Sequence, residues 1–379
     1  MKQLDKNYHR IGESLQPIKV ALLTSSLSLS GAPRIALKVF DELSKSVSIC
    51  TVAVNGGPLA NEFRQLGSVT VLSKGSVKSR LMATLRTPMA WLQLQFRRPD
   101  LIYVNTTAAL LLLDTLHIKN IPVLLHVHEM DSYLALVEQK YGRLLLEVPC
   151  RYIAVSEAVK DALVHRGISS DKISIIPAFI GVSDFDLQQI PKRSQNEPFI
   201  VGGSGYASWH KGTILWLQMV AEVARISPNK NIRFVWIGVD NGQDSWAFKE
   251  MARKLRIDHL IEFAPQTDNP IDYYKKFDVF ALTSWEDSCP VAVLENMMLK
   301  KVVLCFAGSG GAQDELENTG IIVPDFSPAC MAESIVDLMQ HPERCKQLGE
   351  MARLRAESYF TDQAQIPKIF QEIRLAARR

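Results

Sequence analysis

The sequence predicts an α/β chain with two open parallel sheets in tandem, and three observations support this prediction. Short runs rich in β-branched residues alternate with amphipathic stretches of helix length along the chain, as in parallel strands joined by crossover helices. The alternation stops at residues 183–198, a polar segment with the composition of an exposed linker. The chain of 379 residues is also longer than one hydrophobic core normally fills.

The elements of the first half fit one doubly wound domain over residues 1–182. Each predicted strand is a short apolar run, and the stretch from Arg34 to Leu43 has the apolar spacing of a helix. The predicted strands are Ile18 to Leu23, Ile49 to Val54, Leu101 to Val104, Pro122 to Val127, Tyr152 to Val155 and Ile173 to Ile176.

The second half predicts another such domain over residues 199–355, followed by a helical segment over residues 356–379. Open parallel sheets bind ligands beyond the carboxyl ends of their strands, so we expect the active site in a cleft between the two domains. The predicted strands are Phe199 to Gly202, Ile232 to Ile237, Ile261 to Phe263, Val279 to Leu282, Val302 to Phe306 and Ile321 to Val323.

Composition and charge narrow the class of protein. Hydrophobic residues make up 47% of the chain and charged residues 22%, and the net charge of +3 indicates neither nucleic acid nor another strongly charged partner. Residues 1–16 lack the apolar core of a secretory signal. The longest apolar stretch, Ala108 to Leu113, is far shorter than the roughly 20 residues of a membrane-spanning helix. We therefore expect a cytoplasmic protein without a membrane span.

A glycine-bearing turn follows the first strand of each domain. In the first domain, Gly31 opens a turn whose free backbone amides can approach a phosphate or a reacting sugar. The alternative is a plain strand-to-helix turn without a ligand. In the second, residues 202–205 read Gly-Gly-Ser-Gly and lead to Lys211. A lysine beside a glycine-rich loop suits the charge of a pyrophosphate, whereas a solvated surface lysine, the alternative, needs no such neighbours. The spacing matches neither a dinucleotide fingerprint nor a Walker loop.

The stretch from Ser284 to Glu295 is the most informative part of the sequence. A strand ends, Asp287 follows, and a helix is predicted to start at Pro290, a residue suited to the first helical position. The amides of Val291 and Ala292 would then present the positive end of that helix to a diphosphate. One carboxylate could hold sugar hydroxyls and the other a ribose. The alternative is a capping Asp287 and a merely solvated Glu295.

Two histidines end a strand of the first domain. His126 and His128 alternate along it and share one face, with His128 nearer the predicted cleft. Because the spacing of a metal site is lacking, His128 is interpreted as a hydrogen-bonding residue near the substrate, with a structural histidine as the alternative.

Taken together, these motifs resemble glycosyltransferase family 4, of the glycosyl transferases group 1. The resemblance covers nearly the whole chain. It implies the GT-B fold of two facing Rossmann-like domains, with the donor bound mainly by the second. The matching residues are Gly31 to Arg34, His128 and Glu129, Ile153 to Val159, Trp209 to Gly212, Asp287 to Glu295 and Gly308 to Gly311.

This resemblance implies a retaining transferase that takes a nucleotide-diphosphate sugar and usually needs no divalent metal. Lys211 would bind the diphosphate, Glu295 the ribose and Asp287 the transferred sugar. Gly31 would approach the phosphate, and His128 would sit beside the reacting sugar. The predicted catalytic residues are His128, Asp287 and Glu286, and the predicted donor-binding residues are Gly31, Gly203, Ser204, Lys211, Gln266, Val291, Ala292 and Glu295.

The sequence departs from the family pattern at four places. Asp287 stands where the family often has glutamate, with Glu286 beside it as a substitute. The arginine that commonly accompanies the phosphate-binding lysine is absent, since Tyr206 stands five residues before Lys211 and His210 directly before it. Two loops also differ, at Ala178-Phe179 and at Lys300-Lys301-Val302. The lost arginine puts the strength of diphosphate binding in question.

Residues 73–98 form a basic amphipathic segment. It contains six basic residues, no acidic residue and an interleaved set of apolar ones. Such a helix could lie against an anionic membrane or receive a lipid-linked acceptor. The alternative, slightly favoured by the sequence, is a core helix whose apolar stripe is used in packing. The basic residues are Lys74, Lys78, Arg80, Arg86, Arg97 and Arg98, and the apolar ones Val77, Leu81, Leu85, Met89, Leu92 and Phe96.

The sequence therefore favours a glycosyltransferase with a nucleotide-sugar donor and a glycan, lipid-linked or small-molecule acceptor, with surface polysaccharide synthesis as an expected setting. Three alternatives remain. A nucleotide-sugar epimerase would share the donor site. A solute-binding protein would share the two-domain build, although it usually carries a secretion signal. A non-catalytic nucleotide-sugar-binding module would fit the lost arginine.

Overall fold

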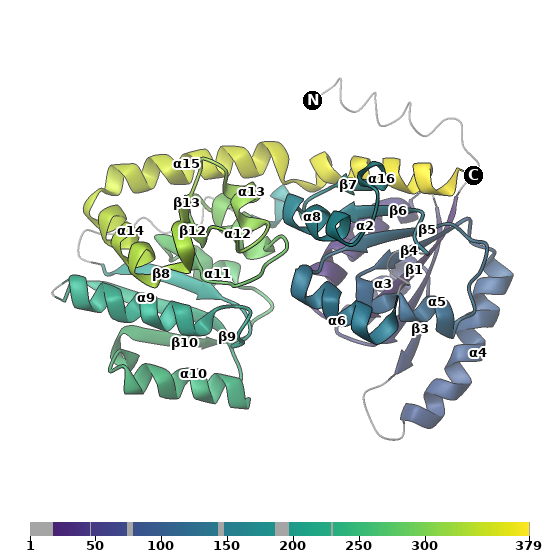
Figure 1. Ribbon diagram of the computed structural model, residues 1–379, viewed down its shortest axis with the longest axis horizontal. Coiled ribbons are helices and arrows are strands. Elements are labelled where there is room, and N and C mark those ends of the chain that lie inside the picture. Colours follow the sequence, from purple (N-terminus) through teal and green to yellow (C-terminus); the bar gives the residue numbers. More distant parts are fainter. Residues whose placement is uncertain are drawn as a thin grey trace. The chain divides into compact units, whose positions relative to one another are not determined.

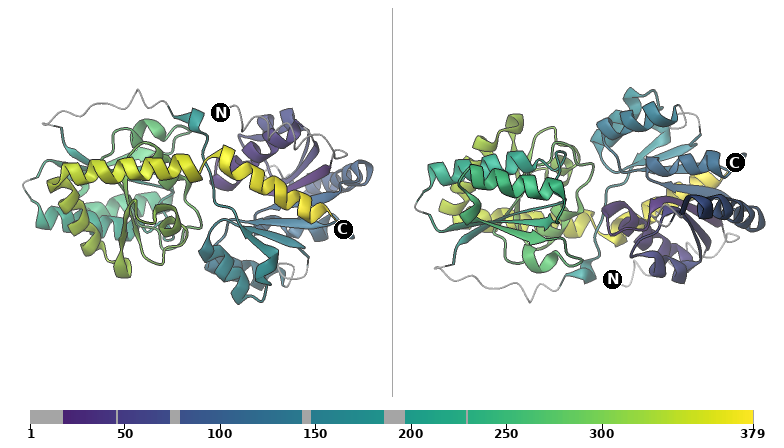
Figure 2. Two further views of the ribbon diagram at one scale, coloured as in Figure 1. Left: turned by 90° about the horizontal axis from the view of Figure 1, so that it is seen from above. Right: turned by 90° about the horizontal axis from the view of Figure 1, so that it is seen from below.

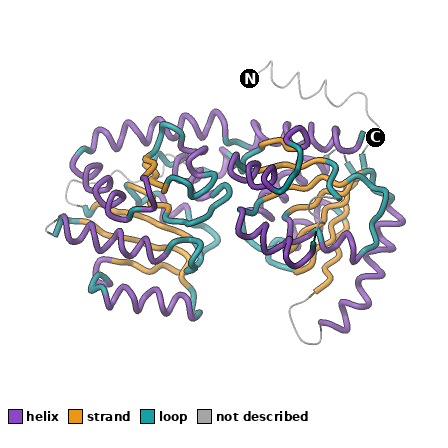
Figure 3. The backbone as a smooth tube through the Cα atoms, in the orientation of Figure 1, coloured by secondary structure: helices purple, strands orange, loops and turns teal. Residues whose placement is uncertain are grey.

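The computed structural model describes residues 18–45, 47–73, 79–142, 148–185, 197–228 and 230–378. The chain divides into two compact units. Unit 1 comprises Met1–Val155, Val159–Ile176 and Ile366–Arg379, and unit 2 comprises Ser156–Ala158 and Pro177–Gln365. In each unit the strands lie in the middle and helices flank them, as Figure 3 shows.

Unit 1 contains a sheet of seven strands, with order β3-β2-β1-β4-β5-β6-β7 (Figure 1). All neighbouring strands are parallel, which confirms the predicted fold class. Every predicted strand of this half is present, and the edge strand β3 was not predicted. The strands are β1 (Lys19–Ser26), β2 (Ser48–Asn55), β3 (Ser68–Ser73), β4 (Leu101–Asn105), β5 (Val123–Val127), β6 (Arg151–Ala154) and β7 (Ile173–Ile175).

Helices connect these strands. The first begins at Gly31, three residues before the predicted start at Arg34, so the glycine turn is itself the first helical turn. The helices are α2 (Gly31–Ser44), α3 (Ala60–Leu66), α4 (Ser79–Arg97), α5 (Leu111–Thr115), α6 (Asp131–Tyr141) and α8 (Glu157–His165), with short 3-10 turns at Thr107–Ala109, Ser170–Lys172 and Val182–Asp184.

Unit 2 contains a sheet of six parallel strands, with order β10-β9-β8-β11-β12-β13. All six predicted strands are present. They are β8 (Phe199–Ser204), β9 (Ile232–Val239), β10 (Ile261–Pro265), β11 (Val279–Leu282), β12 (Val302–Phe306) and β13 (Ile321–Val323). The helices are α9 (Thr213–Ile226), α10 (Gln243–Lys254), α11 (Ile271–Tyr274), α12 (Val291–Met298), α13 (Ala312–Leu316), α14 (Pro328–Gln340) and α15 (Pro342–Tyr359), with 3-10 turns at Asp258–Leu260 and Pro324–Phe326.

The last helix, α16 (Asp362–Ala377), passes from one unit to the other, since its residues from Ile366 onward belong to unit 1. In both views of Figure 2 it lies, in yellow, along the purple and blue elements of that unit. Ile369 and Ile373 on α16 are buried. The segment 356–379 is thus divided between the end of α15 and this helix. The linker expected at 183–198 stays a prediction, because most of it lies outside the described residues.

Both sheets reverse their strand order at the first strand. β1 lies between β2 and β4, and β8 lies between β9 and β11. In open parallel sheets such a switch point leaves a crevice at the carboxyl ends of the two central strands, where ligands bind. The loops after β1 and β4, and after β8 and β11, are therefore the places to look for a site.

Candidate functional site

The predicted site residues fall into two groups, one in each unit. Gly31 and His128 belong to unit 1, after β1 and β5, and all the others belong to unit 2. Among the described residues, no three His, Cys, Asp or Glu side chains cluster as a metal site would require.

In unit 1, Asn105 joins the two predicted residues into one group. It is the last residue of β4, its Nδ2 donates to the backbone oxygen of Ala32 at 3.2 Å, and its Oδ1 lies 3.1 Å from Nε2 of His128. Because Nδ2 must face the carbonyl, Oδ1 faces the imidazole and Nε2 of His128 carries the proton. The sequence reading missed Asn105, although its signal is present as a polar residue that closes an apolar run.

His128 is held in its neutral form. Burial lowers its pKa to about 3, so the ring stays uncharged at neutral pH. The ring of His126 packs beside that of His128, with the ring centroids 4.1 Å apart. Nδ1 of His126 shares a 2.6 Å hydrogen bond with the Tyr103 hydroxyl. A neutral imidazole with a fixed tautomer is suited to hydrogen bonding with a substrate and not to donating a proton as an acid.

Glu129 fixes the backbone next to His128. Its carboxylate accepts from the backbone amide of Thr107 at 3.1 Å and from that of His128 at 3.0 Å. Burial raises its pKa to about 7, because these two amides do not fully replace water. The amide contacts tie the end of β5 to the turn after β4, and so help to set the position of the histidine.

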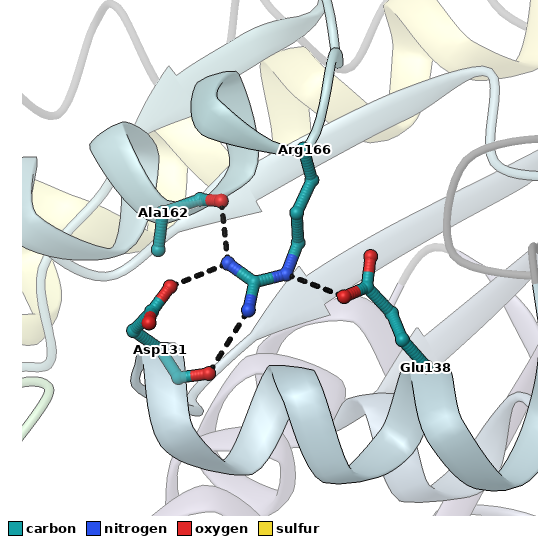
Figure 4. A network of polar contacts seen from close by, with 4 residues as sticks. All are labelled: Asp131, Glu138, Ala162 and Arg166. Atoms are coloured by element: carbon teal, nitrogen blue, oxygen red, sulfur yellow. Dashed lines mark hydrogen bonds and ion pairs between the residues drawn. The ribbon is translucent and has the colours of Figure 1, made fainter.

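Arg166 anchors α6, the helix that follows Glu129 in the chain. Arg166 follows α8 and contacts two residues of α6, Asp131 and Glu138, as Figure 4 shows. Its Nη1 lies 2.6 Å from Oδ1 of Asp131, and its Nη2 donates to the backbone oxygen of Asp131 at 3.0 Å. Its Nε donates to the Glu138 carboxylate at 3.0 Å. It also donates to the backbone oxygen of Ala162 at 2.8 Å. Since α6 begins two residues after Glu129, this network holds the loop that carries His128.

In unit 2, the predicted phosphate lysine and the predicted sugar carboxylate form an ion pair. Nζ of Lys211 lies 2.6 Å from Oδ2 of Asp287, and the Ser284 hydroxyl donates to the same oxygen at 3.1 Å. Both side chains are partly buried, with 25% and 11% of their surface exposed. The ion pair therefore brings together the loops after β8 and β11. The capping alternative is wrong for Asp287, because the N-cap of α12 is Pro290.

Glycines allow the lysine loop to approach so closely. Gly212 has a φ of +63°, and a Cβ there would lie 1.7 Å from the backbone oxygen of Thr283. Gly205 has a φ of +138°, and its missing side chain leaves the room occupied by the stem of Lys211. Only glycine adopts such conformations without strain, so the glycine-rich sequence is explained by the position of the lysine.

The backbone of Asp287 is held from the other side by the Gly308 to Gly311 loop. Its amide donates to the backbone oxygen of Ser309 at 2.7 Å, and its own backbone oxygen accepts from Gly311 at 2.9 Å. A Cβ on Gly311 would lie 2.1 Å from the backbone oxygen of Ser288. The carboxylate is thus fixed at both its main chain and its side chain.

Helix α12 begins at Val291, so the predicted start at Pro290 is wrong by one residue. Pro290 has extended backbone angles and its oxygen accepts from the amide of Val293 at 2.8 Å. The amides of Val291 and Ala292 precede the first intrahelical bond and carry the positive end of the helix dipole. Glu295 lies in this helix and is partly buried, as is Glu286 beside Asp287.

Three other predicted donor residues lie outside the Lys211 and Asp287 contacts. Gly203 is buried, and a Cβ there would lie 2.7 Å from the Trp216 indole nitrogen, so packing accounts for this glycine without any ligand. The Ser204 hydroxyl shares a 3.0 Å hydrogen bond with that of Tyr274. Gln266 donates to the hydroxyl of Tyr206 at 3.0 Å, and both side chains are exposed.

Two family models match consecutive parts of the chain. The model for glycosyltransferase family 4 matches residues 30–183, and that for glycosyl transferases group 1 matches residues 184–355. The D-inositol 3-phosphate glycosyltransferase of Kineococcus radiotolerans is 27% identical over 168 residues, 39% of this chain and 38% of the relative. An uncharacterized glycosyltransferase of Haemophilus influenzae is 24% identical over 41% of this chain and 43% of its own length. The chain thus aligns with less than half of each of these two relatives.

Solved structures match over a longer span. HepE of Anabaena, crystallised with UDP-glucose, superposes with a TM-score of 0.77 at 17% identity, covering 95% of this chain and 100% of HepE. A glycosyltransferase of Rickettsia africae gives 0.76 at 16% identity over 96% and 100% of the two chains. The apo form of the lipopolysaccharide outer core galactosyltransferase WaaB gives 0.69 at 15% identity over 94% and 99%. At these identities the matches show the shared two-domain fold.

Proposed function

Because this chain belongs to the glycosyltransferases of group 1 and family 4, we propose that it transfers a hexose from a nucleotide-diphosphate sugar to a glycan or lipid-linked acceptor with retention of configuration. The Lys211 and Asp287 ion pair, at the switch point of unit 2 and close in sequence to the start of α12, carries the proposal. The HepE structures with UDP and UDP-glucose support a uridine donor.

The residues of unit 2 would bind the donor in three parts. Lys211 and the amides of Val291 and Ala292 would hold the diphosphate, whose negative charge increases as the bond to the sugar breaks. Glu295 would accept from the ribose hydroxyls, and Asp287 would accept from hydroxyls of the sugar. In the unbound state Asp287 neutralises the lysine that the diphosphate would later engage. The resemblance to the family implies that this charge compensation usually works without a divalent metal.

The residues of unit 1 would act on the reacting end of the donor. Neutral His128, with its proton on Nε2 and its ring held by Asn105, would orient the sugar by hydrogen bonding. The first-turn amides of Gly31 and Ala32 would add positive potential for the phosphate. Retention and the identity of the acceptor belong to this proposal, and the basic segment at 73–98 keeps a lipid-linked acceptor among the candidates.

The test measures thermal stabilisation of the chain by nucleotide-diphosphate sugars, beginning with UDP-glucose, with and without added metal. A donor at about a hundred times its dissociation constant should add about 2.7 kcal/mol to the free energy of unfolding. Lys211→Ala should abolish this stabilisation. Asp287→Asn should keep the stabilisation by UDP and lose the additional stabilisation that the sugar of UDP-glucose provides. Lys254→Ala, at an exposed position on α10, is the control. Equal stabilisation of the native chain and Lys211→Ala would rule out the assigned diphosphate site.

Turnover separates transfer from the epimerase and the non-catalytic binding module. A non-catalytic binding module would be stabilised by donor but would release no nucleotide diphosphate with any acceptor. An epimerase would convert the donor in the absence of an acceptor. The proposed transferase should release nucleotide diphosphate in an acceptor-dependent manner, and Glu295→Gln should reduce this release.

A further inference from the structure

Helix α4 presents an apolar face outward from unit 1. Phe96 is 85% exposed, Met89 64% and Leu92 45%, and their spacing of three and four residues places them on one side of the helix. Trp91 flanks them and is 39% exposed. The core packing slightly favoured by the sequence is therefore wrong at Met89, Leu92 and Phe96. Val77, Leu81 and Leu85 fall on residues whose side chains lie outside the described part.

The opposite side of α4 accounts for its attachment to the unit. Ala90 and Leu94 are buried. The Gln93 amide accepts from the Thr70 hydroxyl at 2.5 Å and donates to that of Ser68 at 2.7 Å, both on the edge strand β3. Figure 1 shows α4 at the outer side of the unit, beside β3. The outward apolar face is thus a consequence of how the helix is held.

Positive charge accompanies this face. Arg97 and Arg98 are exposed at the end of α4, and Arg86 lies one turn before Met89. Within the described part of the chain, Arg86 donates to the Val71 carbonyl and Arg97 to the Ser48 hydroxyl, both neutral oxygens. From Ser73 to Arg98 the sequence has no Asp or Glu. Apolar side chains beside arginines, in a stretch without acidic residues, are complementary to a surface that combines negative charge with hydrocarbon.

We propose that this face of α4, defined by Met89, Trp91, Leu92 and Phe96 with Arg86, Arg97 and Arg98, binds the surface of an anionic lipid bilayer. The helix would lie in the plane of the interface, with its apolar side chains below the headgroups and its arginines among them. No helix among the described residues could span a membrane, so attachment would be to one leaflet. The binding needs no donor and stands apart from the proposed transfer.

The charge decides against a second copy of this chain as the occupant. A self-complementary contact through α4 would bring the arginines of both copies together, which is unfavourable at low salt. An anionic bilayer gains from the same charges, and about fivefold in affinity per arginine is expected near such a surface. Large exposed apolar patches on a folded chain also mark interaction sites in general.

The experiment is sedimentation of the full chain with vesicles of phosphatidylcholine alone or mixed with phosphatidylglycerol. Binding is expected only to the mixed vesicles and should weaken as salt is raised, because salt screens exposed charges. Arg97→Gln with Arg98→Gln should weaken binding about fivefold per arginine. Leu92→Ser with Phe96→Ser should weaken it about tenfold or more, through loss of buried apolar area.

Matched controls keep the outcome unambiguous. Leu136→Ser removes an exposed apolar side chain from α6 of the same unit, and Arg64→Gln removes an exposed arginine from α3. Neither should change vesicle binding, and all variants should keep the donor-induced stabilisation. Absence of binding to anionic vesicles at low salt would overturn the proposal. So would a stable dimer in solution that Phe96→Ser dissociates, which would make the face a contact between copies.

Discussion

Glu129 and His128 are neighbours whose burial acts on their protonation in the same direction, toward the uncharged form. The pKa of the carboxyl rises to about 7 and that of the imidazole falls to about 3, because each is removed from water. Around neutral pH the histidine is therefore uncharged and the glutamate is close to its midpoint. The imidazole is therefore uncharged at the place where the proposed function puts the sugar.

The raised pKa of Glu129 predicts a pH-dependent stability. Between the ordinary value of 4.5 and about 7, the folded chain keeps a proton that the unfolded chain has lost. Stability contributed by this group therefore falls as pH rises through that range, by roughly 3 kcal/mol at most, and is level above it. Glu129→Gln should remove this slope in urea unfolding measured from pH 5 to 8. Glu62→Gln, at an exposed position on α3, is the control, and parallel profiles for Glu129→Gln and the native chain would contradict the assignment.

Single residues show what the sequence could and could not predict. Lys211, Asp287 and His128 could be selected as candidates because each stands after an apolar strand or in a glycine-rich loop. Their partners were not recognisable, since Lys211 and Asp287 are 76 positions apart and Asn105 is 23 positions from His128. Such pairs depend on which strands are neighbours in the sheet, and a local pattern does not contain that information.

At the scale of elements, the loops after the strands are shaped by glycines that permit close backbone contacts. Gly203, Gly212 and Gly311 all leave no room for a Cβ, but for different reasons. The first packs against a tryptophan of the core, while the other two let neighbouring loops meet around Asp287. Sequence alone placed Gly203 among donor-binding residues because core packing and ligand approach both select glycine.

Gly212→Ala tests whether the close approach of the lysine loop matters. The new methyl group would meet the Thr283 oxygen and force the loop away, so we expect a loss of roughly 2 kcal/mol or more in stability and loss of the donor-induced stabilisation. Gly167→Ala is the control, because Gly167 also has a positive φ, +89°, and a Cβ there would meet no described atom within 4 Å. It should cost about 1 kcal/mol from backbone strain alone. Equal effects of the two substitutions in thermal unfolding would show that the contact with Thr283 is unimportant.

Two elements were misjudged because tertiary context decided them. Strand β3 is short and only Leu72 in it is buried, so its apolar signal is weak. Helix α4 has an apolar stripe whose pattern is the same whether it faces a core or a lipid surface. The contacts of Gln93 with β3 choose its orientation, and these depend on a strand that the pattern did not reveal.

At the scale of the whole molecule, both units repeat one plan, with the first strand at the switch point of a parallel sheet. The alternation of strands and helices was enough to predict this plan, because it depends on connectivity and burial alone. The return of the chain end to unit 1 was not predictable, since α16 is amphipathic in sequence but its partner face is set by β6 and β7. Glu372 on α16 accepts from Arg151 at 2.6 Å and from the Ser174 hydroxyl at 2.8 Å.

These contacts predict that the C-terminal helix supports unit 1 and not unit 2. Glu372 is 8% exposed and its removal would leave Arg151 partly buried without this carboxylate, so Glu372→Ala should destabilise unit 1 by about 3 kcal/mol. Hydrogen exchange should then become faster in β6, β7 and α16, while β8 to β13 keep their protection. Gln371→Ala, at an exposed position on the same helix, is the control. An equal loss of protection in both sheets would contradict this prediction. It would mean that the two units unfold together, although most contacts of each unit lie within that unit.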